Sequence, residues 1–274
     1  MHKKRTLPGS ATVPHSCFSV DVCLPFILFS AESTTGILHL QKNITWNPVS
    51  ILWLTSLCNE LTDQLNTLSD SVDRDSDGLA DMGKDLQGRA RTAMSSLGVT
   101  YPELSGYYPQ PKGLLFPAFL SVQNLSGIYS PFTIEANYNS AMVSYNLQFT
   151  ICHELSHLRG FMQEEEANFI GFLACVSTDD TAFNYSGYLL GWIYATNELY
   201  ETDYDTFEEV YSRLSDNVKA DLSANSSFWN RYDSKVAEVS GQINDHYLKA
   251  NGQSDGVKSY DRMVDLMITW FRSK

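Results

Sequence analysis

HELSH at residues 153–157 is the stretch of sequence that decides how the middle of this chain folds. The residues around it, from about 146 to 158, have the periodicity of a helix. Positions i and i+4 of a helix share one face, so the imidazoles of His153 and His157 point toward the same metal ion. Glu154 lies beside that face, where its carboxylate can accept a proton from a metal-bound water. The pentapeptide therefore predicts a metal-binding helix that carries its own base.

A second helix is expected directly after the first. Gly160 permits a sharp turn, because glycine enters left-handed conformations at little cost. The segment from Glu164 to Cys175 then has an apolar stripe that includes Phe169 and Phe172. The sequence thus predicts a helical hairpin. Its turn and the acidic residues 164–166 lie next to the face that carries both histidines of the 153–157 motif, which has the pattern HExxH.

Three acids at that corner compete to be the third metal ligand, which catalytic zinc normally requires in addition to a bound water. Glu164 begins the string E-x-x-A-N, which resembles the third-ligand string of glutamate-type zincins. This resemblance implies that Glu164 is the ligand and that Asn168 supports a zinc-binding histidine. Glu166 is the alternative ligand, and Glu165 is expected to face solvent. All three acids also lie at the N-terminus of the second helix, where the positive end of the helix dipole favours negative charge. Their presence can therefore be explained without a metal.

These residue types, in this pattern, point to metal-assisted hydrolysis. Zinc lowers the pKa of a bound water to roughly 7 and polarises a carbonyl. Glu154 is then the expected general base, which passes the proton to the leaving amine. The candidate donors to the oxyanion are Tyr185, Tyr260, Arg159 and the His246-Tyr247 pair, each of which has an ordinary structural explanation too.

The leading hypothesis is a peptidase with one Zn²⁺ per chain, acting on a peptide or protein substrate. The alternative is a non-catalytic, zinc-containing binding or regulatory module of the cell envelope. Intact Glu154 argues against it, because a structural site needs no base and usually has four protein ligands. A third interpretation, in which the histidines bind no metal, leaves the third-ligand string and the glycine turn unexplained.

The rest of the chain predicts an α+β, mostly helical, zincin-like fold with a small sheet beside the HExxH helix. Helices are expected from Pro48, over 84–97, over the uncharged and buried stretch 181–197, over 198–250 and over 256–272. Residues 113–149 alternate short apolar runs with turn residues, which favours strands. Within them, residues 135–139 form either an edge strand that pairs with extended substrate or an ordinary internal strand.

Composition narrows the class of protein. Nineteen Lys and Arg against 32 Asp and Glu give a net charge of −13, which argues against nucleic-acid binding. The five cysteines match no CxxC pattern, and their odd number argues against a full disulfide framework. Cys152 and Cys175 lie in apolar helical stretches and are expected to be buried thiols.

One further segment, residues 70–85, contains part of a calcium-loop pattern. Residues 73–78, DRDSDG, place acids at positions one, three and five and a glycine at position six, and Asp81 falls at position nine. Lys84 occupies position twelve, where a bidentate acid is required. The pattern therefore favours a solvated acidic loop over a calcium site.

Residues 1–45 are expected to be a leader or appendage to a single domain over 46–274. They contain the apolar run CFSVDVCLPFILFS at 17–30, which follows a basic start and is interrupted by Asp21. No run reaches the ~18 apolar residues of a membrane span. The run is consistent with a signal peptide, a remnant of a membrane anchor or an ordinary tail.

The block HELSHLRGFMQEEEANFIGFLAC resembles the signature of domain-of-unknown-function family 3810, a bacterial zincin-like group. Further segments support this resemblance over roughly residues 48–272, namely YPQPKGLLF, GIYSPFTIEANYN, NYSGY and NDHYLKANGQSDGVKSYDRMVDL. The resemblance implies a zinc-dependent peptidase without a settled substrate. It also implies membrane-spanning helices before the domain and a domain outside the cytoplasm, but the first 45 residues have no such spans.

Overall fold

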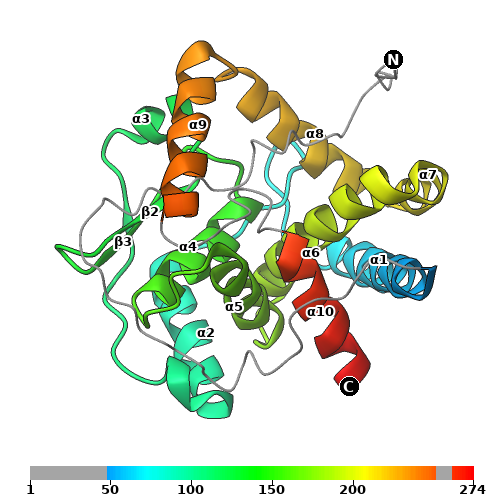
Figure 1. Cartoon of the computed structure of the whole chain (residues 1–274), viewed down its shortest axis with the longest axis horizontal. Helices are drawn as coiled ribbons and strands as arrows, with labels where there is room; N and C mark the ends of the chain where they lie inside the picture. The colour runs from blue at the N-terminus through cyan, green and yellow to red at the C-terminus, as the bar shows by residue number, and fades with distance from the viewer. Residues whose placement is uncertain (1–47, 251–260) are drawn as a thin grey trace.

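The HExxH helix lies near the centre of a mostly helical molecule with a small sheet on one side (Figure 1). The computed structural model describes residues 48–250 and 261–274. Helix α4 (Tyr145–His157) carries the motif, and α5 (Glu164–Val176) follows it as the predicted hairpin. Both pack against α6 (Thr181–Thr202), the predicted uncharged and buried helix. These three helices form the core on which the candidate site is built.

Helix α1 (Pro48–Ser69) lies along α6 and confirms the helix predicted from Pro48. Its apolar positions Leu54, Cys58 and Leu61 recur at three- and four-residue steps and are completely buried. Thr62 accepts a hydrogen bond of 2.9 Å from the indole nitrogen of Trp192 on α6, so the polar group in this interface is satisfied.

The remaining helices surround this core. Helix α2 (Leu86–Thr100), with a short 3₁₀ turn η2 (Pro102–Leu104) after it, lies against α4 and α5. Helices α7 (Tyr204–Ser212), α8 (Asp216–Asn230) and α9 (Lys235–Ala250) fill the predicted helical region, and α10 (Asp261–Ser273) packs on α1, α5 and α6. Residues 251–260, where the last helix was expected to begin, are outside the described residues.

The sheet has three short strands in the order β1-β3-β2. Strand β1 (Lys112–Gly113) runs parallel to β3 (Glu135–Tyr138), and β2 (Gly127–Ser130) pairs antiparallel with the other side of β3. Strand β3 is therefore internal, and the interpretation of residues 135–139 as a substrate-pairing edge is wrong. Strands β1 and β2 are the two outer strands of this sheet.

A second correction concerns residues 117–122, which were expected to be strand and form the short helix α3 (Pro117–Val122). Pro117 stands at the first helical position, where its fixed φ favours a helix and its missing N–H costs nothing. Beneath α3, Leu120 and Leu125 form a small apolar cluster with Leu114 and Ile128. This cluster, not strand pairing, explains the apolar residues of the segment.

The acidic connector is an ordinary turn. Asp75 accepts hydrogen bonds of 2.9 Å from the backbone N–H groups of Asp77 and Leu79, and Gly78 has the positive φ that the turn needs. Among the described residues, the only group of three acids, histidines or cysteines that converge as metal ligands lies elsewhere. The preference for a solvated loop over a calcium site stays a prediction.

Two other predictions concern membrane-spanning helices and cysteine thiols. None of the helices in the described part of the chain is both long and apolar enough to cross a bilayer. The expected appendage 1–45 lies outside the described residues. It includes the apolar run 17–30 and two of the five cysteines, Cys17 and Cys23. Cys152 and Cys175 are free, buried thiols as predicted.

Candidate metal centre

A tight helical hairpin brings the candidate ligands together. Gly160 has a φ of 90°, and its N–H donates to the carbonyl of His157 at 3.0 Å, which ends α4. Helices α4 and α5 then approach closely at Gly171, where a Cβ would lie 3.3 Å from the backbone nitrogen of His153. Because Gly171 has no side chain, α5 can pack closely against α4 beside His153.

The side chains of His153, His157 and Glu164 converge at this hairpin, and all three are buried. One ligand atom from each lies within 4.8 Å of the others. The two Nε2 atoms are 3.1 Å apart, and Glu164 places its carboxylate oxygens 3.3 Å from His153 Nε2 and 4.0 Å from His157 Nε2. Two ligands of a tetrahedral zinc are separated by about 3.3 Å, given zinc–ligand distances of about 2.0–2.1 Å. The group therefore has the spacing and the donor atoms to hold a metal ion.

A backbone carbonyl orients one of the histidines. His157 Nδ1 lies 2.7 Å from the carbonyl oxygen of Phe161, in the turn between α4 and α5. A proton on Nδ1 donated to that oxygen leaves the lone pair of Nε2 facing the other two ligands. Sequence reasoning missed this partner, because a main-chain carbonyl leaves no trace in residue identity.

Asn168, the predicted support for a histidine, is completely buried on α5, one turn after Glu164. Its side-chain amide makes no hydrogen bond to any residue that the structure describes. The supporting role of Asn168 therefore stays a prediction, whereas the contact of His157 with Phe161 is present in the structure.

The other two acids of α5 occupy different positions. Glu165 was expected to face solvent, but it is buried and accepts a hydrogen bond of 3.0 Å from Arg262 on α10. That expectation is wrong, because the C-terminal helix covers this side of α5. Glu166 is half-buried and does not belong to the converging group, which contains Glu164.

The proposed base, Glu154, is fully buried between α4 and the edge strand β2. Its carboxylate lies against the backbone of Gly127, where a Cβ would be 2.1 Å from Glu154 Oε1. Two residues further along β2, the ring of Tyr129 has its centroid 6.1 Å from that of His157. Strand β2 therefore forms one wall of the site, a contribution that the sequence did not reveal.

Two of the candidate oxyanion donors, Tyr185 and Arg159, donate hydrogen bonds to residues outside the converging group. Tyr185 is fully buried on α6 and donates its hydroxyl to Asp221, which also binds Arg74 at 2.9 Å. Burial, together with the Asp221 carboxylate, raises the pKa of Tyr185 above its ordinary value, so its hydroxyl stays protonated. This network links α6 and α8 to the acidic connector, which is a structural role.

Arg159 holds the chain that precedes the sheet. Its guanidinium donates to the carbonyls of Ser105 and Tyr107 at 3.0 and 3.2 Å and lies over the ring of Tyr108. Gly106 makes room for it, since a Cβ there would lie 2.0 Å from Arg159 Nη1. The other candidate donors cannot be placed: Tyr260 is outside the described residues, as are the side chains of His246 and Tyr247 at the end of α9.

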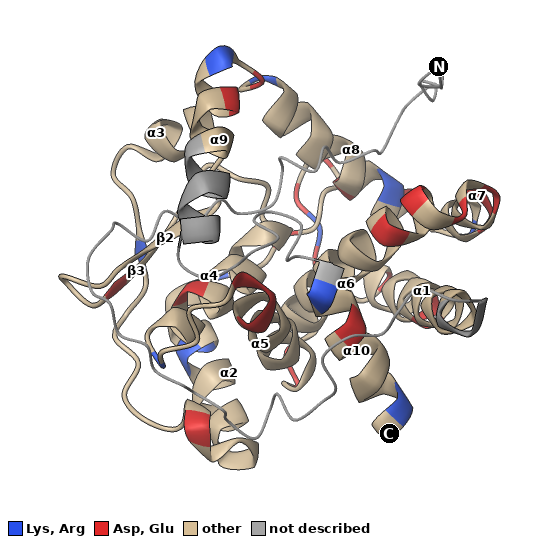
Figure 2. Cartoon of the chain, viewed as in Figure 1, with Lys and Arg blue, Asp and Glu red and all other residues tan. Residues whose placement is uncertain are grey.

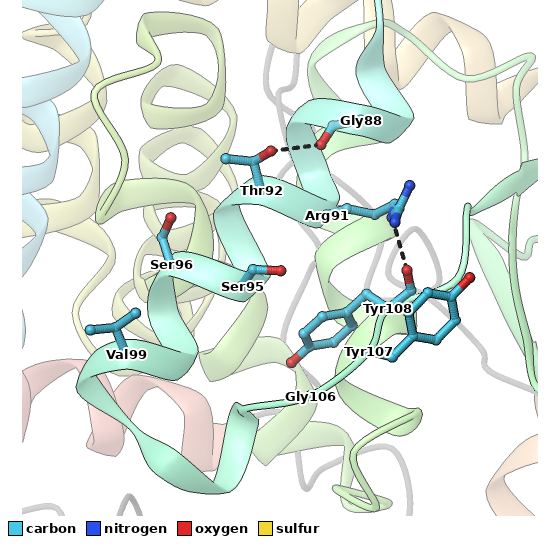
Figure 3. Close-up of a pocket in the computed structure, with 9 residues that line it drawn as sticks. All are labelled: Gly88, Arg91, Thr92, Ser95, Ser96, Val99, Gly106, Tyr107 and Tyr108. Carbon is cyan, nitrogen blue, oxygen red and sulfur yellow. Dashed lines mark hydrogen bonds between the residues drawn. The ribbon is translucent and has the colours of Figure 1, made fainter.

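An open groove of about 510 Å³ lies beside this loop, between one face of α2 and residues 106–108 (Figure 3). Arg91 spans it and donates to the carbonyl of Tyr108 at 2.8 Å. None of the three converging ligands lines this groove. It is a surface feature separate from the three converging side chains.

Fold and site together define a mostly helical protein with a small mixed sheet and a buried group of two histidines and a glutamate that could hold a metal ion. The chain belongs to the family described as "Protein of unknown function (DUF3810)", whose model matches residues 33–268. This confirms the family resemblance, and the match begins before residue 46, where the domain was expected to start. A search among curated proteins found no match, and a search among solved structures found none either.

Proposed function

We propose that this protein is a zinc-dependent peptidase, with His153, His157 and Glu164 as the metal ligands. The observation that carries the proposal is Glu154, a buried carboxylate beside the ligands that is not itself a member of the converging group. A structural metal site has no use for such a group. Zinc is the expected metal because two imidazoles and a carboxylate are its common hydrolytic ligand set, with the fourth position open to water.

When bound, zinc would supply a water of lowered pKa and polarise the carbonyl to be cleaved. Glu154 accepts the proton of the attacking water and delivers it to the leaving amine. The backbone of Gly127 limits where the Glu154 carboxylate can lie, and the carbonyl of Phe161 holds the ring of His157. Each reacting group is thus held by packing before substrate arrives, which lowers the entropic cost of reaction.

The position of β2, an outer strand of the sheet beside Glu154, favours a peptide as the substrate. The backbone N–H of Leu114 donates to the carbonyl of Tyr138, so Tyr138 directs its main-chain groups toward β1. Its partner Gly127 therefore directs its own main-chain groups away from β3. An extended peptide can pair with these outward groups directly beside the ligands.

The decisive experiment measures zinc content and hydrolysis together in wild type and Glu154→Gln. We expect about one zinc per chain in both proteins and cleavage of a peptide library by wild type only. If wild type binds zinc but cleaves no peptide in the library, the non-catalytic module is favoured. If correctly folded wild type binds no zinc after reconstitution, the proposal fails altogether.

A further inference from the structure

The groove between α2 and residues 106–108 contains a positive charge that no acid in its lining neutralises. Helix α2 has two charged residues, Arg89 and Arg91, which Figure 2 shows in blue. Arg89 forms an ion pair with Asp180 at 2.5 Å. Arg91 lines the groove and has no ion pair with any acid that the structure describes. In a chain with 32 acids and 19 bases, such an arginine calls for an explanation.

The contacts of Arg91 use only one side of its guanidinium. The residue is half-buried, and its Nε donates to the carbonyl of Tyr108 at 2.8 Å. Neither of its Nη atoms donates to a residue that the structure describes. Arginine holds a carboxylate or a phosphate through two parallel N–H groups. Arg91 therefore presents a donor face that suits an oxyanion.

Other half-buried arginines of the chain use their Nη atoms. Arg74 and Arg89 each donate an Nη group to a carboxylate, and Arg159 donates both of its Nη groups to main-chain carbonyls. A guanidinium that is partly removed from water loses hydration, so donors left unmet cost free energy. Arg91 is the exception within the described ranges 48–250 and 261–274. A ligand in the groove would meet its unused donors.

A hydroxyl group lies on the same face of α2 as this guanidinium. Ser95 follows Arg91 by four positions, which is about one helical turn. Figure 3 shows both side chains directed from α2 toward the segment 106–108. The hydroxyl of Ser95 makes no hydrogen bond to a described residue, whereas that of Thr92 donates within its own helix. Ser95 thus offers a second donor beside Arg91.

Both walls of the groove are held in place by the protein itself. One wall is the helix α2. The other is fixed by Arg159, whose guanidinium binds the chain at Ser105 and Tyr107, and by the hydroxyl of Tyr108, which donates to the carbonyl of Leu104 at 2.6 Å. A site that is formed before its ligand arrives has less ordering to do on binding.

The groove is larger than an ion alone requires. Its volume of about 510 Å³ falls within the range of about 300–1,000 Å³ that small-molecule sites occupy. Two of its lining residues are apolar or aromatic and face solvent: Val99 is 85% exposed and Tyr107 74%. Such side chains gain free energy when a ligand covers them. The lining therefore favours a ligand that has an apolar body as well as a charge.

We propose that this groove binds a small organic anion. The Nη groups of Arg91 and the hydroxyl of Ser95 hold its carboxylate or phosphate group, and its apolar body covers Tyr107 and Val99. None of the three converging metal-ligand candidates lines the groove, so this proposal is independent of the proposed peptidase function. A net charge of −13 repels anions at long range, so the affinity depends on these short-range contacts.

A polyanion fits these observations less well than a small anion does. Binding of nucleic acid depends on many basic side chains, each of which neutralises one phosphate. The lining of this groove has one basic residue, Arg91. An acidic protein surface would bring many negative charges against a molecule that is itself negative.

The first test compares probe ligands on the full-length protein. Saturable shifts of its amide NMR resonances give the affinities for benzoate, phenyl phosphate and the uncharged analogue benzamide. We expect both anions to bind at least about tenfold more tightly than benzamide, because charge-assisted hydrogen bonds are lost in the analogue. Equal affinities would overturn the assignment of an anion site.

The apolar body is tested with anions that lack a ring. Acetate should bind at least about threefold more weakly than benzoate, and inorganic phosphate should bind more weakly than phenyl phosphate by a similar factor. Equal binding with and without the ring would overturn the proposal in favour of a site for a free inorganic anion. Binding of the capped peptide Ala-Glu-Ala, with no binding of the ring-bearing anions, would overturn it in favour of a protein partner.

The site is tested with Arg91→Gln. This variant should bind benzoate and phenyl phosphate about tenfold more weakly or worse, since the guanidinium is the only charged group in the lining. The matched control is Arg231→Gln, which removes an exposed arginine at the end of α8 and should bind both anions normally. Unchanged affinity in Arg91→Gln contradicts the proposal.

A second pair of variants keeps the test decisive if Arg91→Gln does not fold. Ser95 is exposed, so Ser95→Glu can be accommodated, and its carboxylate can pair with Arg91 one turn away. It should abolish binding of both anions and leave the melting temperature unchanged or slightly raised. The control Ser95→Gln has a side chain of the same size without the charge and should retain most of the affinity. Wild-type affinity in Ser95→Glu would rule the site out.

Discussion

Glu154 and Gly127 are in direct contact, the carboxylate of the helix against the backbone of the edge strand. No side chain fits between them, since a Cβ on residue 127 would lie 2.1 Å from Glu154 Oε1. Helix α4, which carries the proposed base, thus packs directly against β2, the strand proposed to bind substrate. The position of the base relative to a bound peptide therefore depends on a residue that has no side chain.

Gly127→Ala should displace the Glu154 carboxylate while the three ligands stay in place. We expect peptide hydrolysis to fall on the order of a hundredfold, since small displacements of a catalytic group have effects of this size. Zinc content should not change. The control is Gly241→Ala on α9, where a Cβ would meet nothing within 4 Å. Full activity in Gly127→Ala would show that the contact does not position the base.

Glu164→Ala and Glu166→Ala separate the two candidate third ligands within the first turn of α5. The first change should weaken zinc binding by more than about a hundredfold, because one of three ligands is removed. The second should leave binding intact, since Glu166 stands outside the converging group. Titration of the apo protein against a chromogenic zinc chelator measures both affinities. The reverse order would assign the ligand to Glu166.

Tyr185→Phe distinguishes a structural tyrosine from an oxyanion donor. The variant loses the hydrogen bond to the buried Asp221 carboxylate, which should lower the free energy of unfolding by about 1.5–3 kcal/mol. The kcat for peptide cleavage should stay within about twofold of wild type, because no reacting group is touched. Urea unfolding and steady-state kinetics provide the two readouts. A large fall in kcat with unchanged stability would restore the catalytic interpretation.

The pair of Arg89 and Asp180 predicts a pH dependence of stability. Burial raises the pKa of Asp180, but the Arg89 guanidinium and the N–H groups of Ala182 and Phe183 outweigh it, so the pKa lies below the ordinary 3.8. A carboxylate with a lowered folded-state pKa stabilises the fold above its unfolded pKa. That stability is lost as the pH falls through the folded value.

Asp180→Asn removes this dependence and keeps a residue that can cap α6. It should be less stable than wild type by about 1 kcal/mol at about pH 7. The difference should shrink at acid pH, as the pH falls below the ordinary pKa of 3.8 and through the lowered folded-state pKa of Asp180. Denaturant unfolding at the two pH values tests this, with Asp179→Asn as the control for loss of a neighbouring charge. A difference that is constant with pH would mean that the ion pair does not contribute.

Local patterns predicted the helices and the convergence of the three candidate ligands, because both depend on short-range spacing. One or two helical turns of sequence are enough to recognise two patterns. These are the apolar periodicity of α1, α4, α5 and α6 and the i, i+4 spacing of the histidines. The convergence of His153, His157 and Glu164 followed from a helix, a glycine turn and a helix. The metal ion itself and the reaction stay predictions.

Sheet order and long-range contacts could not be predicted in this way. Strand β3 has the same sequence character whether it lies inside the sheet or at its edge, so its position depends on β1 and β2. The burial of Glu165 depends on Arg262, which is 97 residues away in the chain. The role of Gly127 against Glu154 was equally hidden, since a glycine in a strand has many explanations.

The short stretch of chain that contains all three ligands has a consequence for folding. His153 and Glu164 are separated by only eleven positions, whereas the contact of Glu154 with Gly127 closes a loop of 27 (154 − 127) and also requires the sheet to be formed. Short loops close at low entropic cost, so the helical hairpin could capture the proposed ion early, before the rest of the chain has folded. If the proposed metal binds, its retention would therefore be a poor measure of native structure in this protein. A partly folded chain could hold the proposed ion and yet leave Glu154 out of line with it.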